Sequence, residues 1–91
     1  MGERRMYRYE IPVDDQAHVV TLTGEPLAFA ATDTETVEFW AEHDDQAGRT
    51  DRAFRVVGTG HVIPDGARWV GTCPRHYGLV WHLYEVPLPP F

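Results

Sequence analysis

The residues best suited to chemistry form a glycine-rich segment, Gly58-Thr59-Gly60-His61, with His82 further along the chain. A segment of this kind can hold a phosphate when it opens a helix and a cationic side chain lies nearby. Here it follows an alternating apolar stretch and precedes a Pro-Asp-Gly turn, with no helical pattern after it. We therefore interpret it as a bulge or tight bend that requires glycine. A small-ligand or minor enzymatic site built from this segment and His82 is the alternative.

The residues that could bind a metal ion are Cys73, His76 and His82, with His61. The Cys-x2-His spacing is compatible with chelation, but structural zinc sites favour more than one thiol, so no metal site is predicted. His82 lies in an apolar stretch and is interpreted as a core or interface histidine. The chain contains no serine, and Cys73 lacks the helix N-terminus that usually activates a thiol. The residues therefore predict a protein that is not an enzyme and needs no cofactor.

Three aromatic residues are candidates for contact with a protein partner. Trp40 lies between Glu38 and Glu42, on the otherwise polar side of an alternating stretch. Exposed aromatic side chains often anchor interfaces. The alternative is that both faces of the sheet are covered at Trp40, so that its side chain is buried. Trp81 and Tyr84 lie on opposite sides of a strand whose two faces are both apolar. Such a strand is either central in the fold or placed at a subunit contact, so a homodimer is possible.

The apolar pattern predicts that strands position these residues. Apolar side chains recur with a period of two along almost the whole chain, and no window shows a convincing helical period. Glycine and proline clusters separate the stretches, and IPDG at residues 63–66 is the strongest turn signal. The pattern predicts an all-β protein, a small antiparallel β-sandwich or barrel of about seven strands. The strands are expected at residues 6–13, 18–23, 27–32, 36–43, 51–57, 67–73 and 77–86.

The polar loop at residues 44–50 is interpreted as a hairpin connection between the two strands that flank it. This pairing would place Glu38 and Glu42 opposite Arg55 and would help to set the register. Residues 1–86 are expected to form a single β domain with one hydrophobic core. Residues 87–91, PLPPF, are expected to form a proline-rich tail that folds against this domain.

The composition argues against several classes of partner. Of the 91 residues, 14 are acidic and 8 are basic, which gives a net charge of −6 with neutral histidines. Binding to nucleic acid or to an anionic membrane surface is therefore not expected. A single cysteine and the absence of a long apolar run predict a cytoplasmic protein. All the basic residues are arginine, which a GC-rich genome explains most simply because Arg and Lys are nearly equivalent on a solvated surface.

Four blocks of sequence stand in a characteristic order: YRYEIP at residues 7–12, FRVVGTGHVIP at 54–64, GT at 71–72 and VWHLYE at 80–85. Together they resemble a family of small phage and prophage proteins described as a domain of unknown function. The resemblance covers most of the chain, and the spacing of the blocks makes it specific. The chain departs from the family pattern at Val62, where a proline is expected, and in its proline-rich tail.

The resemblance implies a phage gene, and the lysine-free composition points to an actinobacterial host, but neither implies a reaction. Small acidic phage proteins of this kind often act by binding a host protein during infection. The leading hypothesis is therefore a non-enzymatic accessory module that binds a host protein in the bacterial cytoplasm. The alternatives are a small-ligand-binding or minor enzymatic protein and a minor virion component.

Overall fold

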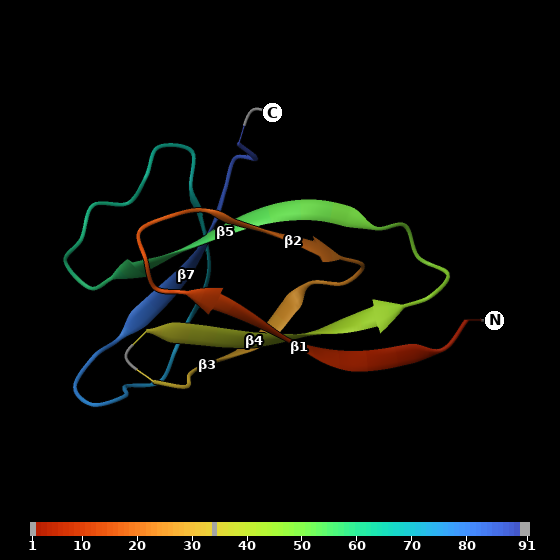
Figure 1. Cartoon of the computed structure of the whole chain (residues 1–91), viewed down its shortest axis with the longest axis horizontal. Coiled ribbons are helices and arrows are strands. Elements are labelled where there is room, and N and C mark those ends of the chain that lie inside the picture. The colour runs from red at the N-terminus through yellow and green to blue at the C-terminus, as the bar shows by residue number, and fades with distance from the viewer. Residues whose placement is uncertain (1, 34, 90–91) are drawn as a thin grey trace.

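The part of the chain that the structure describes consists of strands, turns and loops (Figure 1). The structure is a computed structural model that describes residues 2–33 and 35–89. Within these ranges there is no helix, and hence none long and apolar enough to cross a membrane. The prediction of an all-β protein with about seven strands is confirmed. The strands are β1 (Arg4–Pro12), β2 (His18–Leu22), β3 (Pro26–Ala31), β4 (Thr36–Asp44), β5 (Thr50–Gly58), β6 (Arg68–Thr72) and β7 (Trp81–Val86).

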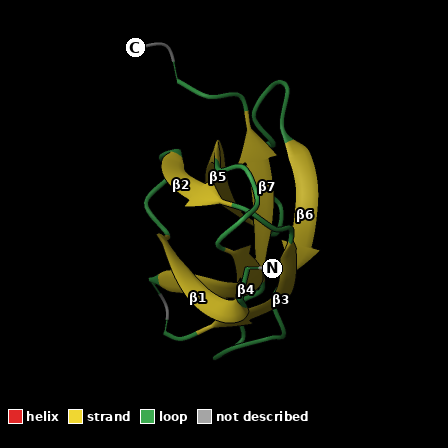
Figure 2. Cartoon of the chain, turned by 90° about the vertical axis from the view of Figure 1, so that its right-hand side faces the viewer, coloured by secondary structure: helices red, strands yellow, loops and turns green. Residues whose placement is uncertain are grey.

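The strands form two antiparallel sheets that pack as a small sandwich (Figure 2). The three-stranded sheet has the order β1-β4-β3, and the four-stranded sheet has the order β2-β5-β7-β6. The chain crosses from one sheet to the other after β1, β2 and β4. Only β3–β4 and β6–β7 are neighbours in both sequence and space, so most of the pairing joins distant segments.

One hydrophobic core lies between the sheets and is centred on aromatic rings. The ring of Phe39 lies 5.4 Å from that of Phe54 across the core and 5.3 Å from that of Tyr9 on β1, between centroids. Tilted and offset ring pairs of this kind stabilise the fold beyond the area they bury. The side chains buried around them alternate along their strands, which is why a period of two predicted the strands. They are Ile11, Leu22, Val37, Ala41, Val56, Cys73 and Leu83.

β6 approaches β3 closely at Gly71. A Cβ atom at this position would lie 2.2 Å from Cε2 of Phe29, whose ring packs against the core. The register of β6 and β7 shifts between Trp69 and Gly71, which marks a β-bulge. The packing of the Phe29 ring therefore requires a glycine in the middle of this strand.

The predicted hairpin across residues 44–50 is wrong. β4 lies between β1 and β3 while β5 lies between β2 and β7, so this loop carries the chain from one sheet to the other. A polar loop in solvent can serve either connection, and its sequence does not distinguish the two. Glu38 and Glu42 are thus not opposite Arg55. Glu38 lies opposite Glu10, and Glu42 lies opposite Met6. Arg55 lies opposite Tyr84.

The last strand begins at Trp81 and not at Tyr77, as the sequence predicted. The backbone N–H groups of His76 and Leu79 each donate to the carbonyl of the other at 2.9 Å. These bonds close a two-residue turn at Tyr77-Gly78, where φ is 49° and 77°. Two successive positive φ values are typical of a type I′ turn. The alternating apolar residues before Trp81 hide this turn in the sequence.

Replacing Tyr77 by asparagine is expected to raise the free energy of unfolding by about 1 kcal/mol, because asparagine tolerates the left-handed backbone better than a bulky side chain. The Tyr77 side chain is 85% exposed, so its removal sacrifices little packing. Urea denaturation measures the change. Tyr77→Phe keeps the ring and the strain and serves as the unchanged control. A loss of stability in Tyr77→Asn would show that the ring makes contacts that outweigh the strain.

The segment after β7 begins at Pro87, beside the β5–β6 loop. A Cβ atom on Gly66 would lie 3.1 Å from Cγ of Pro87, so the start of the segment contacts the β5–β6 loop. Leu88 is 47% exposed. Residues 90–91 of the predicted proline-rich tail lie outside the described residues.

Candidate functional site

The glycine-rich segment forms a tight turn at the end of β5. The N–H of His61 donates to the carbonyl of Gly58 at 3.0 Å, and Gly60 has a φ of 88°. A positive φ at the third position of such a turn favours glycine. A Cβ atom on Gly58 would lie 3.0 Å from the ring of Trp81 and 3.1 Å from that of His61. The segment is therefore a bend, as predicted, and no helix N-terminus follows it in the described residues.

His82 lies on the outer face of β7, and both of its ring nitrogens have hydrogen-bond partners. Nδ1 is 2.9 Å from Oγ1 of Thr72, and Nε2 is 2.9 Å from Oγ1 of Thr59. The indole N–H of Trp69 donates to Oγ1 of Thr72 at 3.0 Å. All these groups are satisfied when the Thr72 hydroxyl donates to Nδ1 and the Nε2–H donates to Thr59. His82 therefore joins β6, β7 and the turn, and it offers no free nitrogen to a ligand.

His61 and Trp81 instead line a pocket of about 370 Å³ between the turn and the β6–β7 loop. Nε1 of Trp81 is buried and has no hydrogen-bond partner among the described residues. Arg75 lines the same pocket and forms no ion pair within the described ranges. An aromatic ring, an unpaired indole N–H and an unpaired guanidinium are groups suited to a small anion.

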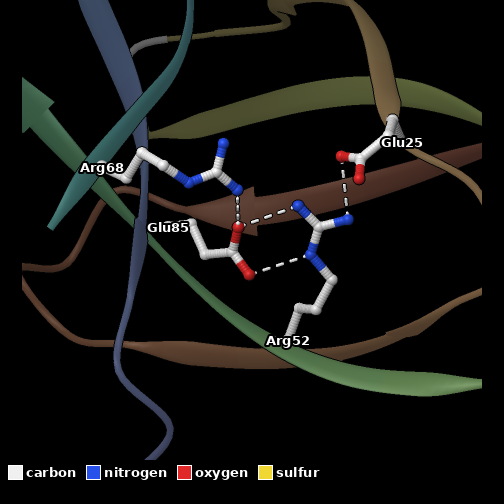
Figure 3. A network of polar contacts seen from close by, with 4 residues as sticks. All are labelled: Glu25, Arg52, Arg68 and Glu85. Atoms are coloured by element: carbon white, nitrogen blue, oxygen red, sulfur yellow. Dashed lines mark hydrogen bonds and ion pairs between the residues drawn. The ribbon is translucent and has the colours of Figure 1, made fainter.

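A larger cavity, of about 600 Å³, opens at another part of the sandwich, where charged side chains replace the core on the inner face of the four-stranded sheet. Arg52 donates from Nε and Nη2 to the two carboxylate oxygens of Glu85, at 2.9 and 2.8 Å (Figure 3). Its Nη1 donates to Glu25 at 2.9 Å, and Arg68 donates to Glu85 as well. This network connects the loop before β3 to β5, β6 and β7.

The pairing in this network holds both central charges in place. The hydrogen bond from Arg52 lowers the pKa of Glu85, although partial burial opposes the shift. The same bond raises the pKa of Arg52 above its ordinary value. Because these charges are already matched inside the cavity, we assign the network to holding β5, β6 and β7 together, with Glu25 adding an exposed contact from the loop before β3. Sequence analysis missed it, and the available signal was an arginine and a glutamate at inward positions of two alternating strands.

The three aromatic residues predicted as one recognition set lie on different surfaces. Trp40 is half-buried on the outer face of the three-stranded sheet, opposite Arg8 of β1. Tyr84 lies on the outer face of the four-stranded sheet, opposite Arg55. Trp81 lies on the other side of β7, opposite Gly58. The strand β7 lies between β5 and β6, with Trp81 on its core side and Tyr84 on its outer side.

A cluster of aromatic and aliphatic side chains gathers around Tyr84. Trp69 is the cross-strand neighbour of Tyr84 on β6 and is 57% exposed. Ile63 and Tyr84 line a small pocket together. Nε of Arg55 is buried here with no hydrogen-bond partner in the part of the chain that the structure describes. Trp69 was missed because it lies in a short strand with a bulge. The cluster is called the outer apolar face and consists of Arg55, Ile63, Trp69 and Tyr84.

Cys73 is 2% exposed in the core, and burial raises the pKa of its thiol to about 11. We expect the native thiol to react with a disulfide reagent on the order of a hundredfold more slowly than in the unfolded chain. Labelling with and without denaturant, followed by absorbance, measures this ratio. Equal rates would show that the core opens readily at β6. In the described ranges, no three His, Cys, Asp or Glu side chains are grouped to hold a metal ion.

Comparison with known protein families gives a match over nearly the whole chain. A family model described as "Domain of unknown function (DUF7352)" matches residues 2–90. No curated protein and no solved structure matches the chain. The match includes both sheets, the turn at Gly58 and the outer apolar face. The expected membership of a family of unknown function is confirmed, whereas a phage origin stays a prediction. The chain belongs to the DUF7352 family.

Proposed function

We propose that the protein is a phage-encoded, non-enzymatic accessory module that binds a host protein through the outer apolar face. The observation that carries the proposal is the guanidinium of Arg55, whose Nε is buried and has no hydrogen-bond partner among the described residues, beside the aromatic side chain of Tyr84. Tryptophan, tyrosine and arginine are the residues enriched where binding energy concentrates in interfaces. A partner that gives a carboxylate to Arg55 and an apolar side chain to Trp69 would satisfy both.

The surroundings of the reactive side chains support a binding role rather than catalysis. Both ring nitrogens of His82 are taken by threonine hydroxyls, and the Cys73 thiol is buried. The Glu85 carboxylate is held by Arg52. A general base or nucleophile needs a free atom that faces a substrate, and none of these three side chains offers one. The resemblance to phage proteins supports a site of action in the host cytoplasm.

The proposal is tested by crosslinking inside the host and by binding to the captured protein. A photoreactive phenylalanine analogue at Trp69 is expected to crosslink a host protein, and the same analogue at Trp40 is not. With that protein purified, Trp69→Ala and Arg55→Glu should each weaken binding about thirtyfold by calorimetry. Trp40→Ala is the matched control and should bind normally. Circular dichroism confirms that each variant is folded.

Two outcomes contradict this proposal. Crosslinking from Trp40 alone would place the interface on the three-stranded sheet. The absence of any crosslinked host protein, with folded chain present in infected cells, would remove the host-binding role itself.

The pocket at His61 supports a second candidate function, the binding of a small anionic ligand. The unpaired indole N–H of Trp81 favours it, because a buried donor without an acceptor is costly. Titration with inorganic phosphate and with benzoate should shift the Trp81 indole N–H signal in NMR spectra. The shift should disappear in His61→Ala and persist in Trp69→Ala. A signal that neither compound moves would argue against this pocket as a site for such anions.

A further inference from the structure

β1 forms an edge of the three-stranded sheet, and β4 is its only strand partner in the described chain. On the β4 side, the carbonyl of Glu3 accepts from the N–H of Asp45, and the N–H of Val13 donates to the carbonyl of Glu35. Odd-numbered residues of this strand therefore point their backbone groups toward β4. Because these groups alternate in direction along a strand, even-numbered residues point theirs toward the open edge. The even-numbered residues are Arg4, Met6, Arg8 and Glu10.

We propose that this edge pairs with β1 of a second copy of the chain, antiparallel about a two-fold axis at Tyr7. In this register Arg4 lies opposite Glu10 of the other copy, and Met6 lies opposite Arg8. Opposed residues of this kind exchange two backbone hydrogen bonds, so the outward groups of the strand are all satisfied. The two Arg4–Glu10 pairs place opposite charges together on the outer face, where they favour the register.

Neighbouring registers are disfavoured by charge or by Pro12. An axis at Met6 places Arg4 opposite Arg8, and an axis at Arg8 places two copies of that arginine opposite each other. Like charges directly opposite in a ladder are destabilising. An axis at Tyr9 opposes as many residues and pairs Arg8 with Glu10, but it places Met6 opposite Pro12, which has no N–H to donate, so two backbone hydrogen bonds are lost. Axes still further from the middle of the strand leave fewer pairs. The alternation of basic and acidic side chains thus makes the edge complementary to itself, whereas the charges of an isolated edge strand normally prevent pairing.

The side chains required for this contact are accessible. The side chain of Arg4 is 70% exposed and that of Glu10 is 54% exposed. Tyr7, on the inner side of the strand, is 42% exposed and stacks on His43 with ring centroids 5.0 Å apart. At the two-fold axis, the two Tyr7 side chains would be direct neighbours and would cover each other. The contact lies on the sheet that does not carry the outer apolar face, so the two proposals succeed or fail independently.

Sedimentation of the full chain tests the assembly. We expect a particle of twice the 10.4 kDa chain mass at tens of micromolar. Arg4→Glu and Glu10→Arg should each weaken dimerisation at least tenfold, because each creates two pairs of like charges. The double variant restores opposite charges and should dimerise again. A chain that stays monomeric at hundreds of micromolar, or a double variant as weak as the singles, would overturn the proposal.

Engineered thiols test the register. Tyr7→Cys should form an intermolecular disulfide under mild oxidation, because directly opposed Cβ atoms lie about 4.5–5.5 Å apart. Arg5→Cys is the matched control: two copies of that position are four residues out of register, about 13 Å along the strand, and should not crosslink. The native Cys73 is buried and contributes no background. Crosslinking through position 5 in preference to position 7 would show that the two copies pair in another way.

Discussion

Alanine at Gly71 is expected to lower the free energy of unfolding by about 3 kcal/mol, which is a large part of the stability of a domain this small. The added Cβ would meet the Phe29 ring at 2.2 Å, closer than such atoms approach. The ring cannot withdraw easily because it packs against the core below β3. Either β6 must move away from β3 or the ring must leave its position. Urea denaturation followed by circular dichroism measures the loss.

Two further variants separate overpacking from a general effect of the substitution. Gly48→Ala is the matched control, since no atom lies within 4 Å of the added Cβ, and its stability should change little. Phe29→Leu reduces the clash, so the double variant with Gly71→Ala should be more stable than the sum of the two single losses predicts. If the loss in the double variant equals the sum of the losses in the two single variants, the ring of Phe29 is not the cause of the destabilisation by Gly71→Ala.

Glutamine at Glu85 is expected to lower the free energy of unfolding by about 2 kcal/mol near neutral pH. The amide accepts fewer hydrogen bonds than the carboxylate, and it leaves Arg52 charged with a side chain only 13% exposed. Glu25→Gln is the control, because that carboxylate is 74% exposed and its ion pair should contribute little. Similar losses in the two variants would indicate that the bidentate pair in Figure 3 carries no special weight.

The same carboxylate predicts how stability depends on pH. The pKa of Glu85 is lower in the folded protein than its ordinary value of 4.5, mainly through the hydrogen bond from Arg52. At a pH between the pKa values of Glu85 in the folded and unfolded states, the unfolded chain binds more protons than the folded chain. Stability therefore falls as the pH decreases below 4.5 toward the folded-state pKa. Denaturation at several pH values should show a shallower decline in Glu85→Gln. Asp14 leaves a residual decline in the same direction, because the hydrogen bond that its carboxylate accepts from His18 lowers its pKa.

The sequence was sufficient to predict the strands because the core has a simple geometry. The strands direct alternate side chains into one core that contains Phe39 and Phe54, so the apolar pattern reveals their positions. The turn after residue 63 was predictable to within one residue, since aspartate and glycine suit the centre of a turn. The N–H of Ala67 donates to the carbonyl of Pro64 at 3.2 Å, so the turn spans residues 64–67 and not 63–66, with Gly66 at a φ of 76°.

The order of the strands was not predictable by the same reasoning. Alternation shows which residues face inward, but it does not show which strand lies alongside, and a polar loop at residues 44–50 fits either choice. The candidate site was also predictable only in part. His82 and the Gly58–His61 turn could be suspected from residue type. Residue type did not show that Thr59 of this turn and Thr72 of β6 occupy the two imidazole nitrogens. Tyr77 gave no signal at all, because tyrosine is uncommon where φ is positive.

The position of β7 in its sheet has a consequence for biosynthesis. β7 lies between β5 and β6, both of which leave the ribosome before it. Until β7 emerges, β6 has no strand partner, and one side of β5 stays open. Translation of the segment takes seconds at about 5–20 residues per second, so the nascent chain exposes these edges throughout. Closure of the sheet is then a late, long-range step, and mixed pairing between nascent chains is the hazard to which this topology is most exposed.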